Sequence, residues 1–365
     1  MQPFAWHART GVESKPGIVA ELGARARALG FARTLLVADR GMIGAGFVAR
    51  AQASLEAAGV AVLTFHDFGE NPDTAMVTAG AAAAGDADSI VALGGGSSLD
   101  CAKGINFIAT NGGRMQDYWG YGKAAQPMLP MIGVPTTTGT GSEAQSYALI
   151  SDAETHVKMA CGAPGAAFRL VLLDPELVLT QPRAVLAAAG YDAISHAVET
   201  LVTVRRNAVS DCFARAAWRL LDQAYEPMLA GGAGIEQAAA MQTGAYLAGA
   251  AIECSMLGAT HACANPLTAR YGTVHGVAIA LMLAPVVRWN AGHASGLYAE
   301  AHPDLAARLD DLAAAARHPR RLREIDVPES DITVLAEDAS KQWTGTFNPR
   351  PFSREGALEL YRCVY

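Results

Sequence analysis

Four side chains able to bind a metal ion lie in Ala-rich helical segments in the second half of the chain. Asp192 and His196 are four residues apart, which places a carboxylate and an imidazole on one face of a helix. His261 and His275 follow further along the chain. A single histidine in such surroundings is more often a core or helix-capping residue. Four polar groups in apolar segments need partners, and one divalent cation would supply a partner to all of them.

The ligand types restrict the metal without selecting one. One carboxylate and three imidazoles suit Fe²⁺, Zn²⁺, Mn²⁺ or Co²⁺. The other histidines occur in polar or terminal contexts, and we expect them at the surface: His7, His66, His156, His293, His302 and His318.

A glycine-rich turn lies between a predicted strand at 89–93 and a predicted helix at 98–110. It reads GGGSSLD over 94–100, and its three glycines let the backbone approach a ligand closely and adopt positive φ. Ser97 or Ser98 can cap the helix, whose N-terminus favours a pyrophosphate. The spacing differs from Gly-x-Gly-x-x-Gly and the turn follows the third strand, not the first, so a plain strand–helix turn is the alternative interpretation.

A second loop, PTTTGTGSE at 135–143, follows another predicted buried strand and offers several hydroxyl groups for phosphate and ribose contacts. Asp39 ends the predicted strand at 34–38. An acid there can accept a hydrogen bond from a ribose 2′-OH and would repel a 2′-phosphate, which favours NAD over NADP. Asp39 alone could equally be a turn residue, and Arg40 keeps NADP possible.

The elements that would position these residues differ between the two halves of the chain. Near-continuous apolar strands are predicted at 34–38, 61–65, 89–93, 130–134 and 170–173, and they alternate with amphipathic helices at 16–30, 46–58, 73–85 and 98–110. This alternation predicts a mainly parallel sheet covered on both faces. Later segments have helical periodicity: 182–188, 191–203, 207–227, 234–252, 257–269, 274–291 and 297–317. We therefore predict a nucleotide-binding α/β domain over 1–178 and an all-helical metal-binding domain over 179–365, with a ligand-binding cleft between them.

Composition excludes several classes of function. The formal net charge of −7 argues against a nucleic-acid surface. No apolar run reaches the roughly 18 residues of a membrane span, and the N-terminal residues lack the pattern of a signal peptide. Six isolated cysteines indicate reduced thiols and a cytoplasmic location.

Several longer patterns occur in a fixed order: GGGSSLDCAKG at 94–104, PTTTGTGSE at 135–143, LDPEL at 173–177, GYDAISHAVET at 190–200 and His-x13-His at 261–275. Together they resemble the iron-containing (group III) alcohol dehydrogenases, which have a dehydroquinate synthase-like fold. The resemblance extends from about Phe4 to the segment ending at Pro351. It implies the two-domain fold expected above, an active site between the domains and a homodimer.

The resemblance also implies roles for single residues. Asp192, His196, His261 and His275 would hold one divalent metal, Fe²⁺ first, with Zn²⁺ or Mn²⁺ as alternatives. The residues that would line NAD, or possibly NADP, are Asp39, Asn71, Gly95, Gly96, Ser97, Asp100, Thr136, Thr137, Thr140 and Lys158. Asn265 stands where many members carry a histidine that contacts the substrate or relays a proton. Asparagine can bind a substrate hydroxyl but cannot exchange a proton near neutral pH.

The expected activity is hydride transfer between a metal-bound primary or secondary alcohol and NAD, or the reduction of an aldehyde or ketone. A glycerol- or polyol-type dehydrogenase is one alternative. A dehydroquinate synthase-like lyase is another, although residues 240–290 offer only Arg270 and Arg288 for a phosphorylated acid. A non-catalytic nucleotide sensor is the third. Pocket walls, which could also be core residues, are expected at Met256, Leu257, Tyr147, Trp119 and Tyr118.

Overall fold

The computed structural model describes residues 4–365, which form two compact units. One unit is His7–Gln181 and the other contains Pro182–Tyr365. The boundary lies at Gln181, three residues beyond the predicted end at 178. Trp6 belongs to the second unit, where its ring packs against Phe213 with the ring centroids 6.1 Å apart.

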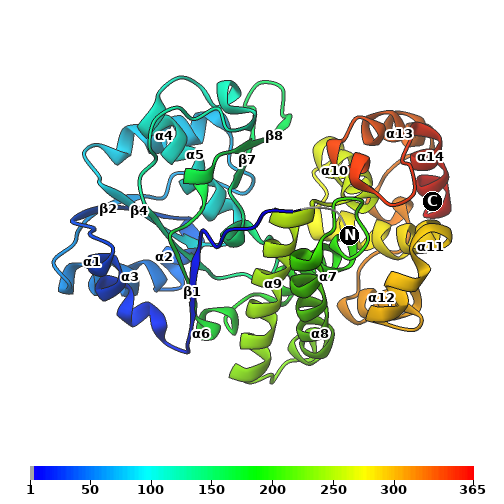
Figure 1. Ribbon diagram of the computed structural model, residues 1–365, viewed down its shortest axis with the longest axis horizontal. Coiled ribbons are helices and arrows are strands. Elements are labelled where there is room, and N and C mark those ends of the chain that lie inside the picture. The colour runs from blue at the N-terminus through cyan, green and yellow to red at the C-terminus, as the bar shows by residue number, and fades with distance from the viewer. Residues whose placement is uncertain (1–3) are drawn as a thin grey trace. The chain divides into compact units, whose positions relative to one another are not determined.

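The first unit contains a six-stranded, fully parallel sheet (Figure 1). Its strand order is β1 (Gly11–Ser14), β9 (Leu170–Leu173), β6 (Met131–Pro135), β4 (Ser89–Gly94), β2 (Arg33–Ala38) and β3 (Ala61–Phe65). The chain runs from β2 to β3 and then returns to β4 on the other side of β2. The strand order therefore reverses between β2 and β4, and ligands of open parallel sheets bind beyond the carboxyl ends of the strands at such a point.

Alternate side chains of the strands face opposite sides of the sheet, and helices cover both faces. Leu36, Val91 and Ile132 pack with residues of α1 (Leu22–Ala28) and α3 (Phe47–Ala57), which lie side by side (Figure 1). Helix α5 (Gly96–Asn111) packs against β4 and β2, and α4 (Thr74–Ala84) against β3. The predicted covered parallel sheet is confirmed.

Strand β1 and the strands of a second, smaller sheet were not predicted. Strand β1 lies at the sheet edge, and its residues are largely exposed. The second sheet has the order β5 (Gly120–Tyr121), β8 (Lys158–Gly162), β7 (Tyr147–Ser151), in which β7 and β8 are antiparallel. Buried and more exposed residues alternate along β7, so this strand lacks the continuous apolar run of a central parallel strand.

Among its described residues, the second unit contains helices and connecting loops but no strands. Its helices are α7 (Arg183–Thr200), α8 (Ala208–Ala230), α9 (Ile235–Ser255), α10 (Ala259–Tyr271), α11 (His275–Ala301), α12 (Leu305–Ala316), α13 (Ile332–Ser340) and α14 (Arg354–Cys363). The two predicted helices at 182–188 and 191–203 are the single helix α7. Gly190 lies inside this helix. A Cβ there would be 2.7 Å from the Tyr225 ring, so the close packing of that ring requires glycine. Across residues 4–365, none of the helices has the length and apolar character that a membrane crossing requires.

Candidate metal and cofactor sites

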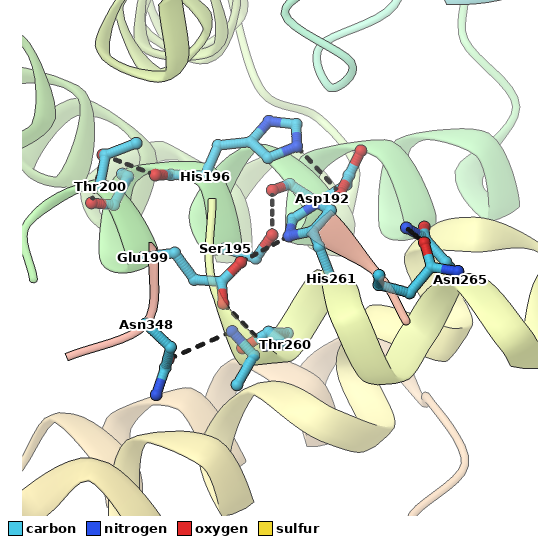
Figure 2. Close-up of polar contacts among 12 residues, drawn as sticks. Asp192, Ser195, His196, Glu199, Thr200, Thr260, His261, Asn265 and Asn348 are labelled. Carbon is cyan, nitrogen blue, oxygen red and sulfur yellow. Dashed lines mark hydrogen bonds and ion pairs between the residues drawn. The ribbon is translucent and has the colours of Figure 1, made fainter. Parts of the chain in front are cut away.

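Three helices of the second unit bring the predicted metal ligands together. Asp192 and His196 lie on α7, His261 lies on α10, and His275 is the first residue of α11. The Nε2 atoms of His196, His261 and His275 are 3.3, 3.5 and 3.7 Å from Oδ1 of Asp192. Figure 2 shows Asp192, His196 and His261 directed toward one another. Asp192, His196 and His261 are buried, and His275 is partly exposed.

The donor atoms fit a metal ion better than they fit one another. Asp192 Oδ1 and His261 Nε2 are both buried, and neither makes a hydrogen bond. Leaving a buried polar atom unpartnered costs about 1–3 kcal/mol. The ligand atoms of Asp192, His261 and His275 lie within 4.8 Å of one another. One cation among them would satisfy both unpartnered atoms.

His196 lies at the edge of this group. Its Nε2 is near the Asp192 carboxylate, but His196 is not among the three residues whose ligand atoms share the 4.8 Å spacing. The ring of His196 stacks on that of His261, with the centroids 5.0 Å apart, and its Nδ1 makes no hydrogen bond. The structure thus brings three of the predicted ligands to metal-binding spacing and the fourth beside them.

Glu199, one turn after His196 on α7, orients His261 and was not singled out from the sequence. Its Oε2 is 2.5 Å from Nδ1 of His261, and its Oε1 accepts a hydrogen bond of 2.7 Å from the N–H of Thr260. In Figure 2 the imidazole of His261 lies between Glu199 and Asp192. A proton on Nδ1 leaves the Nε2 lone pair for a metal, which is a common arrangement of metal-binding histidines. In the sequence, Glu199 lies in GYDAISHAVET, seven residues after Asp192 and therefore on the same helix face. This spacing could have identified Glu199 as part of the site.

Asn348 holds the start of α10 in this arrangement. Its Oδ1 accepts hydrogen bonds from the N–H of Ala259 and from Asn290, each 3.1 Å long. A Cβ at Gly258 would lie 2.9 Å from that oxygen and 3.0 Å from Oε1 of Glu199. Glycine is therefore required where α10 approaches the two polar side chains.

Electrostatic coupling is strong among these buried groups. Burial by itself raises the pKa of Asp192, but His196 and His275 outweigh that effect and hold the pKa well below its usual value. Burial lowers the pKa of His261, while the carboxylates of Asp192 and Glu199 reverse this and raise it to about 9. The site thus favours positive charge beside a carboxylate.

Asn265 lies on α10 one turn after His261 (Figure 2). Its side-chain amide donates a 3.0 Å hydrogen bond to Oε1 of Gln342, a partner that the sequence did not suggest. Among the possible pocket walls, Tyr118 is a core residue that packs against Phe107, whereas Trp119 is half exposed.

The predicted cofactor residues of the first unit follow the carboxyl ends of its parallel strands. Asp39 follows β2 and caps the short helix α2 (Arg40–Gly44) by accepting from the N–H groups of Gly41 and Met42. Its other oxygen accepts a 3.0 Å hydrogen bond from the Ser98 hydroxyl on α5. Asp39 therefore links the ends of β2 and β4 at the point where the strand order reverses.

The glycine turn and the threonine loop pack directly against each other. The N–H of Thr136 donates to the carbonyl of Gly94 at 2.9 Å. A Cβ at Gly95 would be 3.1 Å from the Thr137 side chain, and one at Gly96 would be 2.5 Å from that of Thr140. These two glycines are needed for the contact between the loops. No side chain caps the N-terminus of α5 beside them, which leaves its first N–H groups available to a phosphate.

Asn71, Ser97 and Lys158 form a second contact group in this unit. The N–H of Asn71 donates to the Ser97 hydroxyl at 3.2 Å, and Lys158 donates to the Asn71 side chain at 3.1 Å. Asp100 is placed differently. It is buried under the threonine loop and accepts a 2.6 Å hydrogen bond from Ser142.

One histidine prediction is wrong. His318 is buried, its Nε2 is 3.2 Å from the carbonyl oxygen of Ala187, and burial lowers its pKa. It is a core residue of the helical unit because its ring packs edge-on against Tyr191, a contact far apart in sequence.

Comparison with known proteins identifies one family for both halves of the chain. Residues 10–175 match the family profile of iron-containing alcohol dehydrogenase, and residues 186–365 match the C-terminal profile of the same family. The chain is 34% identical to alcohol dehydrogenase 4 of Schizosaccharomyces pombe, over 91% of this chain and 82% of that protein. It is 30% identical to the NAD-dependent methanol dehydrogenase of Bacillus methanolicus, over 92% of each chain.

A solved structure of 1,3-propanediol oxidoreductase superposes with a TM-score of 0.93 at 30% identity, covering 97% of this chain and 98% of that one. Both halves of the sequence and the whole fold therefore lead to the same group of proteins. The chain belongs to the iron-containing alcohol dehydrogenase family.

Proposed function

We propose that the protein is a metal-dependent alcohol oxidoreductase that transfers a hydride between the carbinol carbon of a small alcohol and NAD, or from NADH to an aldehyde or ketone in reverse. The observation that carries this proposal is the convergence of Asp192, His261 and His275, with two of their donor atoms buried and unpartnered. Family membership supports the redox chemistry.

Asp192, His261 and His275 would hold the divalent metal, with His196 as the fourth ligand. Fe²⁺ is the first candidate, and Zn²⁺ or Mn²⁺ suit the same donors. A metal bound here supplies Lewis acidity, which favours the deprotonated form of an alcohol hydroxyl. Glu199 keeps Nε2 of His261 available, and Asn265 offers an amide oxygen to a substrate hydroxyl while its amide nitrogen is bonded to Gln342.

NAD is the preferred cofactor. The carboxylate of Asp39 at the end of β2 would repel a ribose 2′-phosphate. The guanidinium of Arg40, which could attract that phosphate, is paired with Asp67 at 2.8 Å. Gly95, Gly96, Ser97, Thr136, Thr137 and Thr140 surround the uncapped N-terminus of α5, where a pyrophosphate would bind, and Asn71 with Lys158 lies next to Ser97.

Small primary alcohols are the proposed substrates. Two similar proteins are named for methanol and for 1,3-propanediol, and both names describe primary alcohols. A polyol substrate is the alternative within the same superfamily. A homodimer and a cytoplasmic location stay predictions from the sequence.

Metal-stripped protein resupplied with Fe²⁺, Zn²⁺ or Mn²⁺ tests the proposal. We expect NADH formation with primary alcohols, measured by absorbance, to require added metal and to fall at least about 100-fold in His261→Ala, because the remaining donors would bind the ion weakly. His293→Ala, an exposed histidine on α11, is the matched control and should retain wild-type turnover. Undiminished turnover after complete metal removal would contradict the proposal.

A further inference from the structure

Lys103 is a lysine with no exposed surface, on α5 of the first unit. Its Nζ donates hydrogen bonds to the main-chain carbonyls of Ser142, Gln145 and Tyr147, at 2.5, 2.7 and 2.9 Å. Lysine is almost never fully buried without partners. An ammonium group has three donors, and here three carbonyls converge on it.

Asp100 contacts the same loop from the same helix, one turn before Lys103. The Ser142 hydroxyl donates to Asp100 Oδ1 at 2.6 Å and lies 3.2 Å from Nζ of Lys103. Ser142 is therefore held through its side chain by a carboxyl group and through its carbonyl by an ammonium. Both anchors come from α5, the helix whose N-terminus faces the proposed pyrophosphate position.

The segment 136–147 contains the short 3₁₀ turn Ser142–Ala144, and Lys103 binds carbonyls within this turn and just after it. Gly139 and Gly141 increase its conformational freedom, and Gly141 has φ +66°. At its other end Thr137 and Thr140 lie against Gly95 and Gly96. The carbonyls that Lys103 binds therefore belong to the same segment as the threonines that lie beside the glycine turn.

We infer that Lys103 is a positioning residue for the dinucleotide: its buried ammonium fastens segment 136–147 to α5 and so holds Thr136, Thr137 and Thr140 in place for the cofactor. This inference rests on the proposed function, because it assigns the segment to NAD binding. Lys103 does not touch the cofactor in this proposal. It acts through the loop.

A general loss of stability would also weaken binding, and Asn106 provides the matched control. Asn106 is likewise fully buried on α5, three residues after Lys103. It donates to the carbonyl of Leu129 at 2.8 Å and accepts from the N–H of Leu129 at 3.0 Å. It therefore fastens a different segment to the same helix.

The test compares Lys103→Met with Asn106→Leu in the full chain. NADH affinity is measured by fluorescence titration, amide hydrogen exchange by mass spectrometry, and the melting temperature by calorimetry. For Lys103→Met we expect NADH to bind at least about tenfold more weakly, which corresponds to about 1.4 kcal/mol, with faster exchange confined to 136–147. Both variants should lower the melting temperature by similar amounts, because each removes buried hydrogen bonds. Asn106→Leu should nevertheless leave NADH affinity within about twofold of the wild type.

Ser142→Ala keeps the main-chain carbonyl and removes only the hydroxyl between Asp100 and Lys103. It is the variant to test if Lys103→Met does not fold. It should weaken NADH binding about threefold, and unchanged affinity in this variant would count against the inference. The inference is overturned if Lys103→Met binds NADH like the wild type, or if Lys103→Met and Asn106→Leu lose affinity equally. If the wild-type protein binds no NADH, the proposed function is rejected instead. The rate of amide hydrogen exchange in residues 136–147 would still show whether Lys103 fastens the loop.

Discussion

Glu199 uses both carboxylate oxygens as hydrogen-bond acceptors where α7 meets α10. One oxygen accepts from the N–H of Thr260 and the other from Nδ1 of His261. The two donors belong to consecutive residues, so the carboxylate fixes the start of α10 and the ring of His261 together. A neutral amide in its place offers one acceptor and one donor, and therefore cannot satisfy both contacts.

Glu199→Gln should for this reason weaken metal binding by about 10- to 100-fold, the range typical of residues that orient a metal-binding histidine. The measurement is competition with a chromogenic chelator, using Zn²⁺ as the probe. Glu236→Gln, an exposed glutamate on α9, is the control and should bind Zn²⁺ like the wild type. Equal Zn²⁺ affinity in the wild type and both variants would show that Glu199 does not contribute to metal binding.

Because its pKa is raised, Glu143 is expected to make the stability of the protein depend on pH. It is buried in the first unit, and burial raises its pKa from 4.5 to about 7. Between these values the folded state holds a proton that the unfolded state releases, so the free energy of unfolding falls as the pH rises through this window. At about 1.4 kcal/mol per pKa unit, the full loss amounts to about 3–4 kcal/mol.

Glu143→Gln removes this titration. Relative to the wild type, its free energy of unfolding should increase by less than about 1 kcal/mol at pH 5 and by about 3 kcal/mol at pH 8, as measured by urea denaturation. Glu154→Gln, at an exposed glutamate of the same unit, is the control and is expected to show the same difference from the wild type at both pH values. A parallel pH profile for Glu143→Gln and wild type would show that Glu143 ionises normally.

At the scale of elements, the first turn of α5 meets the loop after β6. The absence of a side chain at Gly96 lets Thr140 come close, because a Cβ there would be 2.5 Å from the threonine methyl. The contact is with the short, branched side chain of Thr140, whose Cβ would itself be 2.8 Å away, so rotating this side chain cannot relieve it. The helix start and the loop must therefore move together.

Gly96→Ala should weaken NADH binding at least about tenfold by displacing the loop, while Zn²⁺ affinity stays unchanged because the metal ligands belong to the other unit. Gly44→Ala in α2 is the matched control, since a Cβ there meets nothing within 4 Å. It should leave both affinities unchanged and slightly favour its helix. Tight NADH binding by Gly96→Ala, measured by fluorescence titration, would contradict this reading of the turn.

At the scale of the whole molecule, the two proposed sites are built in separate units. The metal donors all come from Pro182–Tyr365, and the proposed cofactor residues all come from His7–Gln181. A ligand that binds only the folded state stabilises it by about 2.7 kcal/mol at 100 times its dissociation constant. Each ligand should therefore protect the unit that holds it.

Hydrogen exchange should show this separation. Zn²⁺ is expected to slow exchange mainly in α7, α10 and the start of α11, and NADH mainly in the turn at 94–98 and the loop at 136–147. The exposed start of α14 serves as an internal reference for both ligands. Protection of the same segments by both ligands would contradict the assignment of one site to each unit.

The sequence alone determined the fold class and the types of ligand. Continuous apolar strands such as β4 and β6, and the long Ala-rich helices, follow from periodicity within a few residues, which is a local property of the chain. The spacing of Asp192 and His196 on one helix is local for the same reason. Strand β1 and the small second sheet have weaker local patterns and were not predicted, and the short helices α13 and α14 were also missed.

Only the tertiary structure decided which polar groups share an environment. Glu199 and His261 are 62 positions apart, Lys103 and Ser142 39, and His318 and Ala187 131. Whether Lys103 is a surface charge or a buried anchor, or His318 an exposed or a core residue, depends on which distant segments pack against it. Burial and hydrogen-bond partners arise from contacts between segments far apart along the chain, so no local pattern contains them.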